Sequence, residues 1–309
     1  MKAESAVKAH LGINTGFALN RFPRPETWAR IVREDLGLRR IQLTADVFGA
    51  HHSGDIQQEM VERIRAACGE FDIWVQTAFT GAYTRVNHLM HPDEGIRRFW
   101  FDWLKRFFDV AAALGAEGAG SHAGILSVED ERDPERRAER VSCAVGLWQQ
   151  LSEHAAEAGL DYLIYEPMSI PRELGETIDK AREFREAVQA GSHLPFLYCL
   201  DVDHGDVASE DPRDTDPYAW LEKLGAHAPV VHVKQSLTDK GGHYPFTEQY
   251  NRQGRVWPEK VLAGLEKGGA KDVTLLLEIS HRERMPFDQQ VVSDLVESVR
   301  FWRPYAEVD

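Results

Sequence analysis

Short apolar runs alternate with longer stretches of helical periodicity along the chain. The strand-like runs lie near residues 10–14, 39–44, 72–77, 117–122, 161–166, 196–201, 229–234 and 273–278. The helical patterns cover residues 26–36, 55–69, 93–114, 132–158, 175–190, 216–226, 257–268 and 287–302. Strict alternation of strands and helices, eight of each, predicts an α/β protein with a (β/α)₈ barrel. We therefore expect one barrel domain over residues 1–309.

An open, doubly wound sheet is the alternative that the same alternation allows. The glycine-rich turn that binds dinucleotides in such sheets is missing after the first strand, where the sequence reads NTGF from Asn14. No linker rich in Gly, Pro or Ser divides the chain. The sequence therefore favours the barrel.

Four consecutive strand-like runs end in a residue that binds metals or transfers protons. These residues are Glu166, Asp201, His232 and Glu278. The carboxyl ends of barrel strands form the active-site mouth. Burying an unpaired carboxylate is costly, so a function explains such glutamates better than a structural role does. Three carboxylates and one imidazole indicate a site for one divalent metal ion, with Mn²⁺ expected first and Co²⁺, Mg²⁺ or Zn²⁺ as alternatives.

Structural roles compete with metal binding at two of these four positions. Asp203 and Asp206 follow Asp201 closely, and one of these acids could cap the next turn. His232 lies between two valines, where a histidine bonded within the core is as common as a ligand. The acids at the neighbouring strand ends favour the ligand.

Further polar residues are expected around the same mouth. Substrate-binding roles are assigned to Asn14, Arg85, His88, His122, His204, Lys234 and Arg282. Lys234 shares the face of His232, because side chains alternate along a strand. Structural roles compete here too, since histidines at loop starts often bond only to backbone.

The longest irregular segment, about residues 237–257, has the composition of an active-site lid, with a double-glycine hinge, aromatic rings and cations. Long loops at a barrel mouth are commonly functional. A subunit contact in a homo-oligomer, a dimer or a tetramer, is the alternative. The cations expected to bind a substrate phosphate are Lys234, Arg252, Arg255 and Arg282.

Charge and composition narrow the class of partner. Lys and Arg total 36 against 50 Asp and Glu, a formal net charge of −14. Such acidity works against tight binding to nucleic acid. The chain lacks an apolar signal-peptide core and an apolar run of membrane-spanning length, so we expect a cytoplasmic protein with no membrane partner. Cys68, Cys143 and Cys199 are far apart and predict neither a disulfide nor a structural zinc site.

Several motifs resemble the sugar phosphate isomerase/epimerase superfamily, the xylose-isomerase-like barrels. The likeness covers nearly the whole chain and rests on Glu166, Asp201-x-x-His204, His232-x-Lys234 and Glu278. Within that group, LGINTGFALNRFP, AYTRVNHL, YEPMSIPRE, CLDVDHGD, HVKQS and LLLEISHRE are similar to the erythrulose phosphate epimerases of erythritol breakdown. In ketose epimerases the metal ligands are Glu, Asp, His and Glu at the ends of strands five to eight. The resemblance therefore implies the same four ligands here, with His204 in contact with substrate.

The resemblance implies a metal-dependent ketose-phosphate 3-epimerase or racemase, acting on a tetrulose (erythrulose) phosphate. A divalent ion lowers the barrier to removing the proton next to the ketone. Glu166 and Glu278 would act as catalytic bases on opposite faces, one removing a proton and the other returning one. The expected partner is a small sugar or sugar phosphate.

Other activities remain open from the sequence. A decarboxylase of an oxo sugar acid, as in related barrels of apiose breakdown, would use the same metal. A single base on one face would give an aldose–ketose isomerase. A non-catalytic sugar-binding barrel has no need of two opposed glutamates. The apurinic endonuclease branch uses three zinc ions and an Asp-x-His motif, whereas Asp239 and His243 are four apart here.

Overall fold

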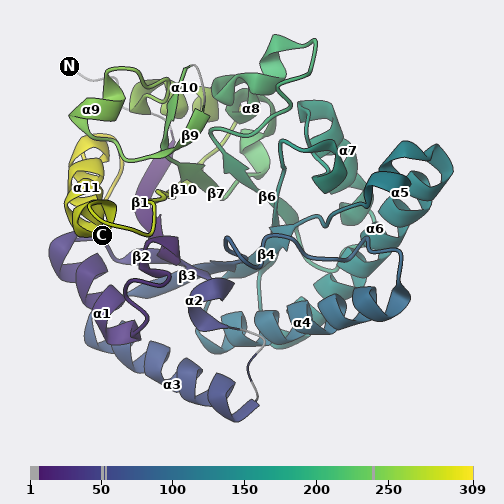
Figure 1. The fold of residues 1–309 in the computed structure, drawn as a ribbon, viewed down its shortest axis with the longest axis horizontal. Helices are drawn as coiled ribbons and strands as arrows, with labels where there is room; N and C mark the ends of the chain where they lie inside the picture. The colour runs from purple at the N-terminus through teal and green to yellow at the C-terminus, as the bar shows by residue number, and fades with distance from the viewer. Residues whose placement is uncertain (1–6, 50–51, 53, 239–240, 309) are drawn as a thin grey trace.

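The computed structural model describes residues 7–49, 52, 54–238 and 241–308. Within these ranges, eight parallel strands close into a barrel in the order β1, β10, β7, β6, β5, β4, β3, β2 (Figure 1). They are β1 (Lys8–Asn14), β2 (Arg40–Thr44), β3 (Trp74–Phe79), β4 (Gly118–His122), β5 (Tyr162–Glu166), β6 (Phe196–Asp201), β7 (Val230–Val233) and β10 (Asp272–Leu277). Each predicted strand-like run overlaps one of them, so the predicted (β/α)₈ barrel is confirmed.

Helices surround the barrel on its outer side (Figure 1). They are α1 (Pro25–Arg30), α2 (Ala45–Phe48), α3 (Gly54–Glu70), α4 (Glu94–Ala113), α5 (Val128–Arg132), α6 (Pro134–Ala158), α7 (Ile178–Gln189), α8 (Pro217–Leu224), α9 (Glu248–Asn251), α10 (Pro258–Lys267) and α11 (Phe287–Trp302). Short 3₁₀ or π turns are η1 (Thr15–Ala18), η2 (Ile31–Asp35), η3 (Pro171–Glu173), η4 (Pro212–Thr215) and η5 (Gly225–His227). Among the described helices, none has the length and apolar character that a membrane span requires.

The predicted helix at residues 132–158 corresponds to α6, which begins two residues later, and a short additional helix, α5, precedes it. Asp133 is extended and separates α5 from α6, and its carboxylate accepts hydrogen bonds from the backbone N–H groups of Glu135 and Arg136. Pro134 occupies the first turn of α6. An aspartate followed by proline satisfies the free N–H groups of a helix start, so α6 begins at Pro134.

The barrel wall divides the hydrophobic core into two clusters. The inner cluster consists of Phe79, Ile164, Cys199, Val230 and Leu276, with partly buried rings and side chains around it. The larger cluster lies between the strands and the helices and includes Val231 and Val233. Because side chains alternate along β7, the valines that pack on helices leave His232 on the inner face, above Val230.

The shortness of the side chains in β4 determines how closely β5 approaches it. The strand reads GAGSH, which has low β propensity, yet it pairs with β5 along its whole length. A Cβ on Gly120 would lie 1.7 Å from the backbone oxygen of Ile164, its partner in β5. This close pairing places His122, the last residue of β4, directly beside Glu166.

The segment expected to form a lid is packed on the barrel over much of its length. It includes the end of β8 (Gln235–Leu237), the antiparallel β9 (Gly241–Tyr244) and α9. Phe246 is fully buried, and its ring stacks on that of Phe301 in α11 with centroids 5.3 Å apart. Its second half therefore belongs to the outer layer, while β9 carries His243 to the mouth of the barrel.

Candidate active site

The four residues predicted as metal ligands converge at the carboxyl end of the barrel. One donor atom from each of Glu166, Asp201, His232 and Glu278 lies within 4.8 Å of the others. The Nδ1 atom of His232 is 3.0 Å from Oε1 of Glu166, 3.4 Å from Oε1 of Glu278 and 4.0 Å from Oδ2 of Asp201. The register of β6 against β7 pairs Asp201 with His232. The arrangement is a buried set of oxygen and nitrogen donors around one point.

A chain of hydrogen bonds orients the imidazole of His232. The backbone N–H of Gly16 donates to Oδ1 of Asn14 at 2.7 Å, which directs the Asn14 amide NH₂ to Oε1 of Gln42 at 2.9 Å. The same Gln42 oxygen lies 2.7 Å from Nε2 of His232, while the Gln42 NH₂ group donates to Thr77. Since an amide oxygen and a carboxylate only accept, Nε2 of His232 donates to Gln42 and Nδ1 donates to Glu166. A metal ion bound at Nδ1 would take the place of that second proton, while Gln42 keeps the other proton on Nε2.

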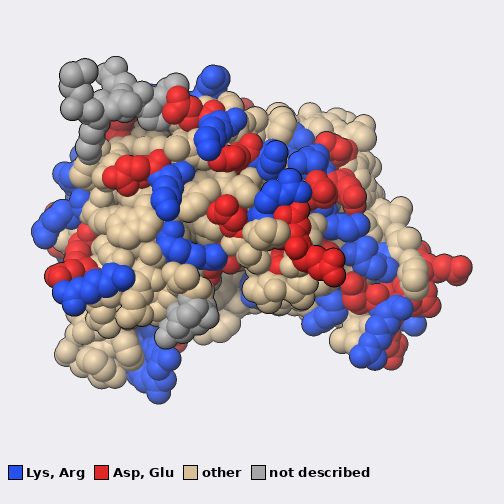
Figure 2. Space-filling model, turned by 90° about the horizontal axis from the view of Figure 1, so that it is seen from above, with Lys and Arg blue, Asp and Glu red and all other residues tan. Residues whose placement is uncertain are grey.

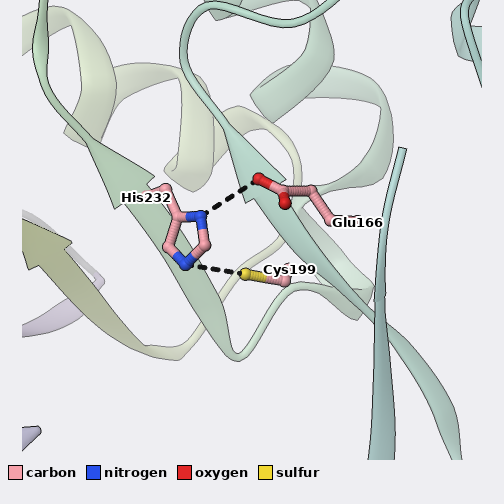
Figure 3. Close-up of side chains that lie close together, drawn as sticks. All are labelled: Glu166, Cys199 and His232. Atoms are coloured by element: carbon pink, nitrogen blue, oxygen red, sulfur yellow. Dashed lines mark hydrogen bonds and ion pairs between the residues drawn. The ribbon is translucent and has the colours of Figure 1, made fainter. Parts of the chain in front are cut away.

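Cys199 approaches the same imidazole from its other end (Figure 3). Its sulfur is 3.2 Å from Nε2 of His232, whereas Glu166 faces Nδ1. Burial raises the pKa of the Cys199 thiol to about 11, so the thiol is neutral near pH 7. An ion held at Nδ1 would lie on the Glu166 side of the ring, whereas the sulfur of Cys199 lies at Nε2 on the other side.

Imidazoles surround the carboxylate of Glu166. Its Oε2 atom is 2.9 Å from Nε2 of His122, and its Oε1 atom is 3.7 Å from Nδ1 of His204. Nδ1 of His204 is 2.9 Å from the backbone oxygen of Pro167, so this nitrogen donates and Nε2 is left for another partner. Burial acts to raise the pKa of Glu166, but His232, His204 and the hydrogen bonds from His122 and His232 lower it overall.

An ammonium group and a further imidazole surround the carboxylate of Glu278. Lys234 is fully enclosed, bonds closely to Asp201 and donates to Oε2 of Glu278 at 3.1 Å. Its Nζ atom is also 2.8 Å from Nε2 of His243 on β9. Burial opposes the charge of Lys234, but Asp201, Glu278 and Glu166 raise its pKa. Lys234 therefore lies inside the carboxylate cluster and not on the wall that a substrate would contact.

The charges of the cluster suit a divalent cation. Glu166, Asp201 and Glu278 contribute three negative charges and Lys234 one positive charge, which leaves two negative charges when His232 is neutral. Oxygen donors with one imidazole are the ligands that Mn²⁺, Mg²⁺ and related ions accept. The residues present therefore fit a divalent ion in both charge and donor type.

A cavity of about 490 Å³ lies over this cluster at the barrel mouth. Its wall includes six of the site residues predicted from the sequence: Asn14, Arg85, His122, Glu166, His204 and Glu278. His243 also lines it. The cavity is therefore bounded by ends of several strands and by the β9 hairpin, as expected for a site at the carboxyl face of a barrel.

Besides Lys234, two predicted substrate-binding residues, His88 and Arg282, lie outside this cavity. The ring of His88 packs against those of His91 and Trp100, at centroid distances of 5.5 and 5.8 Å. Arg282 lines a neighbouring cavity of about 480 Å³ and stands over the ring of Phe287. For both residues a packing role accounts for the observed position.

The cations expected to bind phosphate are engaged elsewhere. Arg255 donates to Asp203 at 2.6 Å and to the backbone oxygen of Thr215 at 2.9 Å. Arg252 is exposed and pairs with Glu248 one turn earlier. The bonds of Arg255 attach the segment at residues 237–257 to the loop after β6, and the ion pair of Arg252 lies along α9. Neither residue lines the mouth cavity.

The sequence interpretation missed Gln42 and the role of His243. Gln42 is a buried polar residue in the middle of β2, between two apolar residues. This interruption of an apolar run was the signal in the sequence that could have identified it. His243 lies within the segment interpreted as a lid, and its bond to Lys234 depends on how β9 folds back. Asp239, considered for a zinc motif, lies outside the described residues.

Comparisons with known proteins agree with this architecture. The family model described as a xylose isomerase-like TIM barrel matches residues 29–305. A Brucella abortus (strain 2308) protein named D-erythrulose 1-phosphate 3-epimerase is 40% identical over 298 residues, which are 96% of this chain and 96% of that protein.

Solved structures show the same fold. A candidate xylose isomerase from Rhodospirillum rubrum gives a TM-score of 0.88 at 24% identity, over 97% of this chain and 100% of that one. D-psicose 3-epimerase from Clostridium cellulolyticum H10 gives a TM-score of 0.64 at 15% identity, over 96% and 91% of the two chains.

These matches decide the family and the class of enzyme. The Brucella relative is named as an epimerase, which confirms the predicted class, an isomerase. The family model spans most of the chain, and the relative covers nearly all of it. The chain therefore belongs to the xylose isomerase-like TIM barrel family.

Proposed function

We propose that this chain is a metal-dependent 3-epimerase of a tetrulose phosphate, with D-erythrulose 1-phosphate as the first substrate to test. The substrate is suggested by the name of the Brucella relative, which is similar along almost the whole chain. The chemistry is suggested by one observation: two glutamates, one at the end of β5 and one after β10, meet at Nδ1 of His232 in the wall of the mouth cavity.

Glu166, Asp201, His232 and Glu278 would hold the metal ion. When bound, a divalent ion makes the proton beside a ketone easier to remove by withdrawing charge from the ketone oxygen. Gln42 supports this role by fixing the His232 tautomer, as described above. Asp201 is held by Lys234, which orients it and limits repulsion among the three acids.

The two glutamates are the proposed acid–base pair. Each presents Oε1 to His232, and each has Oε2 beside a side chain that carries protons. His122 is that neighbour for Glu166, and Lys234 with His243 fills the place for Glu278. One glutamate would remove the proton from carbon 3, and the other would return a proton to the opposite face.

Exchange with solvent tests this proposal. The protein, supplied with Mn²⁺, is incubated with D-erythrulose 1-phosphate in D₂O, and the two enantiomers are separated by chiral chromatography and analysed by NMR. We expect inverted product that carries deuterium at carbon 3, because the returning proton comes from a glutamate that exchanges with solvent. Inverted product without solvent deuterium would rule out the two-base route.

The same experiment separates the alternatives. Release of CO₂ from an oxo sugar acid, with no inversion of the ketose phosphate, would indicate a decarboxylase. Formation of an aldose phosphate would indicate an isomerase that uses one base on one face. Nucleic acid is a poor candidate, because Lys and Arg alternate with Asp and Glu over the face shown in Figure 2 and the net charge is −14.

A further inference from the structure

Arg85 supplies a positive charge to the wall of the cavity at the barrel mouth. Among the described residues, it is the one Lys or Arg that lines the cavity over the carboxylate cluster. Of the acids in that wall, Glu166 and Glu278 lie among the imidazoles, while the carboxylate of Asp46 accepts hydrogen bonds from the loop that carries Arg85. An anionic group on a substrate is therefore drawn toward Arg85 and repelled by the carboxylates.

A buried carboxylate holds the guanidinium of Arg85 in place. Its Nη2 group donates to Oε1 of Glu173 at 2.7 Å, and the Glu173 side chain is only 4% exposed while that of Arg85 is 40% exposed. Oε2 of Glu173 has no hydrogen-bond partner. The buried Glu173 in η3 therefore holds the guanidinium group of Arg85 in place, and the positive charge of Arg85 offsets the cost of burying the Glu173 carboxylate.

The loop that carries Arg85 is anchored on its other side by Asp46. The Asp46 carboxylate accepts hydrogen bonds from the backbone N–H of Tyr83 at 2.8 Å and from the backbone N–H and hydroxyl of Thr84 at 3.1 and 2.7 Å. Arg85 therefore follows a fixed turn, and little conformational entropy remains to be lost when it binds a ligand.

We propose that Arg85 binds the phosphate group of the substrate. Glu173 takes up one guanidinium N–H, and within the described chain the Nε and Nη1 groups have no acceptor. A guanidinium offers donors in a planar fork that matches phosphate oxygens. With the phosphate at Arg85, carbons 2 and 3 of a ketose 1-phosphate would lie in the same cavity as Glu166 and Glu278. This assignment rests on the proposed function and adds the orientation of the substrate to it.

Substrate pairs with and without phosphate test the proposal. Arg85→Gln removes the charge, Arg85→Lys keeps a charge beside Glu173 but loses the fork, and Arg252→Gln is the matched control. Arg252 is likewise ion-paired to a glutamate but lies outside the mouth cavity. Steady-state kinetics are measured with D-erythrulose 1-phosphate and with unphosphorylated D-erythrulose, and thermal unfolding confirms that each variant folds.

We expect Arg85→Gln to lower kcat/KM for the phosphorylated sugar by about 10- to 150-fold, mainly through KM, since charge-assisted hydrogen bonds are lost. Turnover of the free sugar should change by less than about threefold. Arg85→Lys should give a smaller loss and Arg252→Gln none. Equal losses on both sugars, or no loss on the phosphorylated sugar, would overturn the assignment. If Arg85→Gln does not fold, the same comparison with Arg85→Lys decides.

Binding of inorganic phosphate separates this inference from the proposed function. Calorimetric titration of the unaltered protein, the two Arg85 variants and the Arg252 control needs no turnover. Weaker phosphate binding in the Arg85 variants alone supports the anion site even if no tetrulose is epimerised. Equal binding by all four proteins contradicts it, whatever reaction the enzyme catalyses.

Discussion

The two glutamates of the site have the same chemistry but different surroundings. Glu166 ends β5 and its side chain is 4% exposed, whereas Glu278 follows β10 and is 26% exposed. Imidazoles border Glu166, and a permanently charged lysine borders Glu278. Burial acts to raise the pKa of Glu278, but His232, Lys234 and His243 hold it well below its usual value.

This difference indicates two kinds of proton supply. Solvent hardly reaches the Glu166 carboxylate, but its Oε2 atom lies 2.9 Å from Nε2 of His122, which lines the cavity, so protons would reach Glu166 through that ring. Lys234 keeps its proton and stabilises Glu278 as a carboxylate, which exchanges directly through the open mouth. The proposed two-base mechanism needs both faces to work, and under it each glutamate would exchange protons by a different route.

Removal of the metal ion should have the largest effect, because proton removal by either glutamate is proposed to need the ion. We expect chelation to abolish epimerisation and Mn²⁺ or Co²⁺ to restore it, since the ion is proposed to activate the ketone. Activity is followed by the change in optical rotation of the product, with metal content measured in parallel. Full turnover by a metal-free sample would show that the carboxylate cluster works alone.

Replacing each glutamate in turn tests whether Glu166 and Glu278 contribute equally to the reaction. Glu166→Gln and Glu278→Gln keep an oxygen donor and similar volume but remove the base, so inversion should fall by about 10²-fold or more. Each variant should still exchange the carbon-3 proton of one enantiomer, because the remaining glutamate serves its own face. Deuterium exchange of the two separated enantiomers measures this. Near-normal inversion in both variants is incompatible with a two-base mechanism.

The neighbours of the glutamates should differ in their effect on stability. Lys234→Met leaves Asp201 and Glu278 buried without their counter-ion, so the free energy of unfolding without metal should fall by about 3–5 kcal/mol. His122→Gln keeps a donor beside Glu166 and should cost about 1 kcal/mol. Urea unfolding with and without Mn²⁺ provides the measurement. Equal losses of unfolding free energy in the two variants would mean that the surroundings of Glu166 and of Glu278 depend on a neighbouring charge to the same degree.

Gln42 should have the smallest effect on activity, because it acts only through His232. Gln42→Leu removes the acceptor that holds the imidazole proton on Nε2, and loss of such a partner weakens metal affinity by about 10- to 100-fold. Saturating Mn²⁺ should restore most of the activity. Titration of metal against the variant, with Gln150→Leu on an exposed face of α6 as control, would detect the change. An unaltered affinity would mean that the carboxylates orient His232 without Gln42.

The sequence alone determined the strand–helix alternation and the four strand-end residues that converge. Each of these residues lies at or near the end of an apolar run, and in a parallel barrel all strand ends meet at one face, so the linear pattern was sufficient to place them together. The same reasoning placed His122 and His204 at the mouth. Local order along the chain therefore carried most of the information about the fold and the donor set.

Only the tertiary structure decided how the remaining charged residues pair. Lys234 was expected at the substrate, but the register of β7 between β6 and β10 encloses it among Asp201 and Glu278. Arg255 and Asp203 meet although 52 residues separate them, and Arg85 meets Glu173 across 88. A side chain's partner is set by distances in space, which short-range patterns do not encode. The sequence thus specifies which groups face the centre, while packing specifies which of them remain available to a substrate.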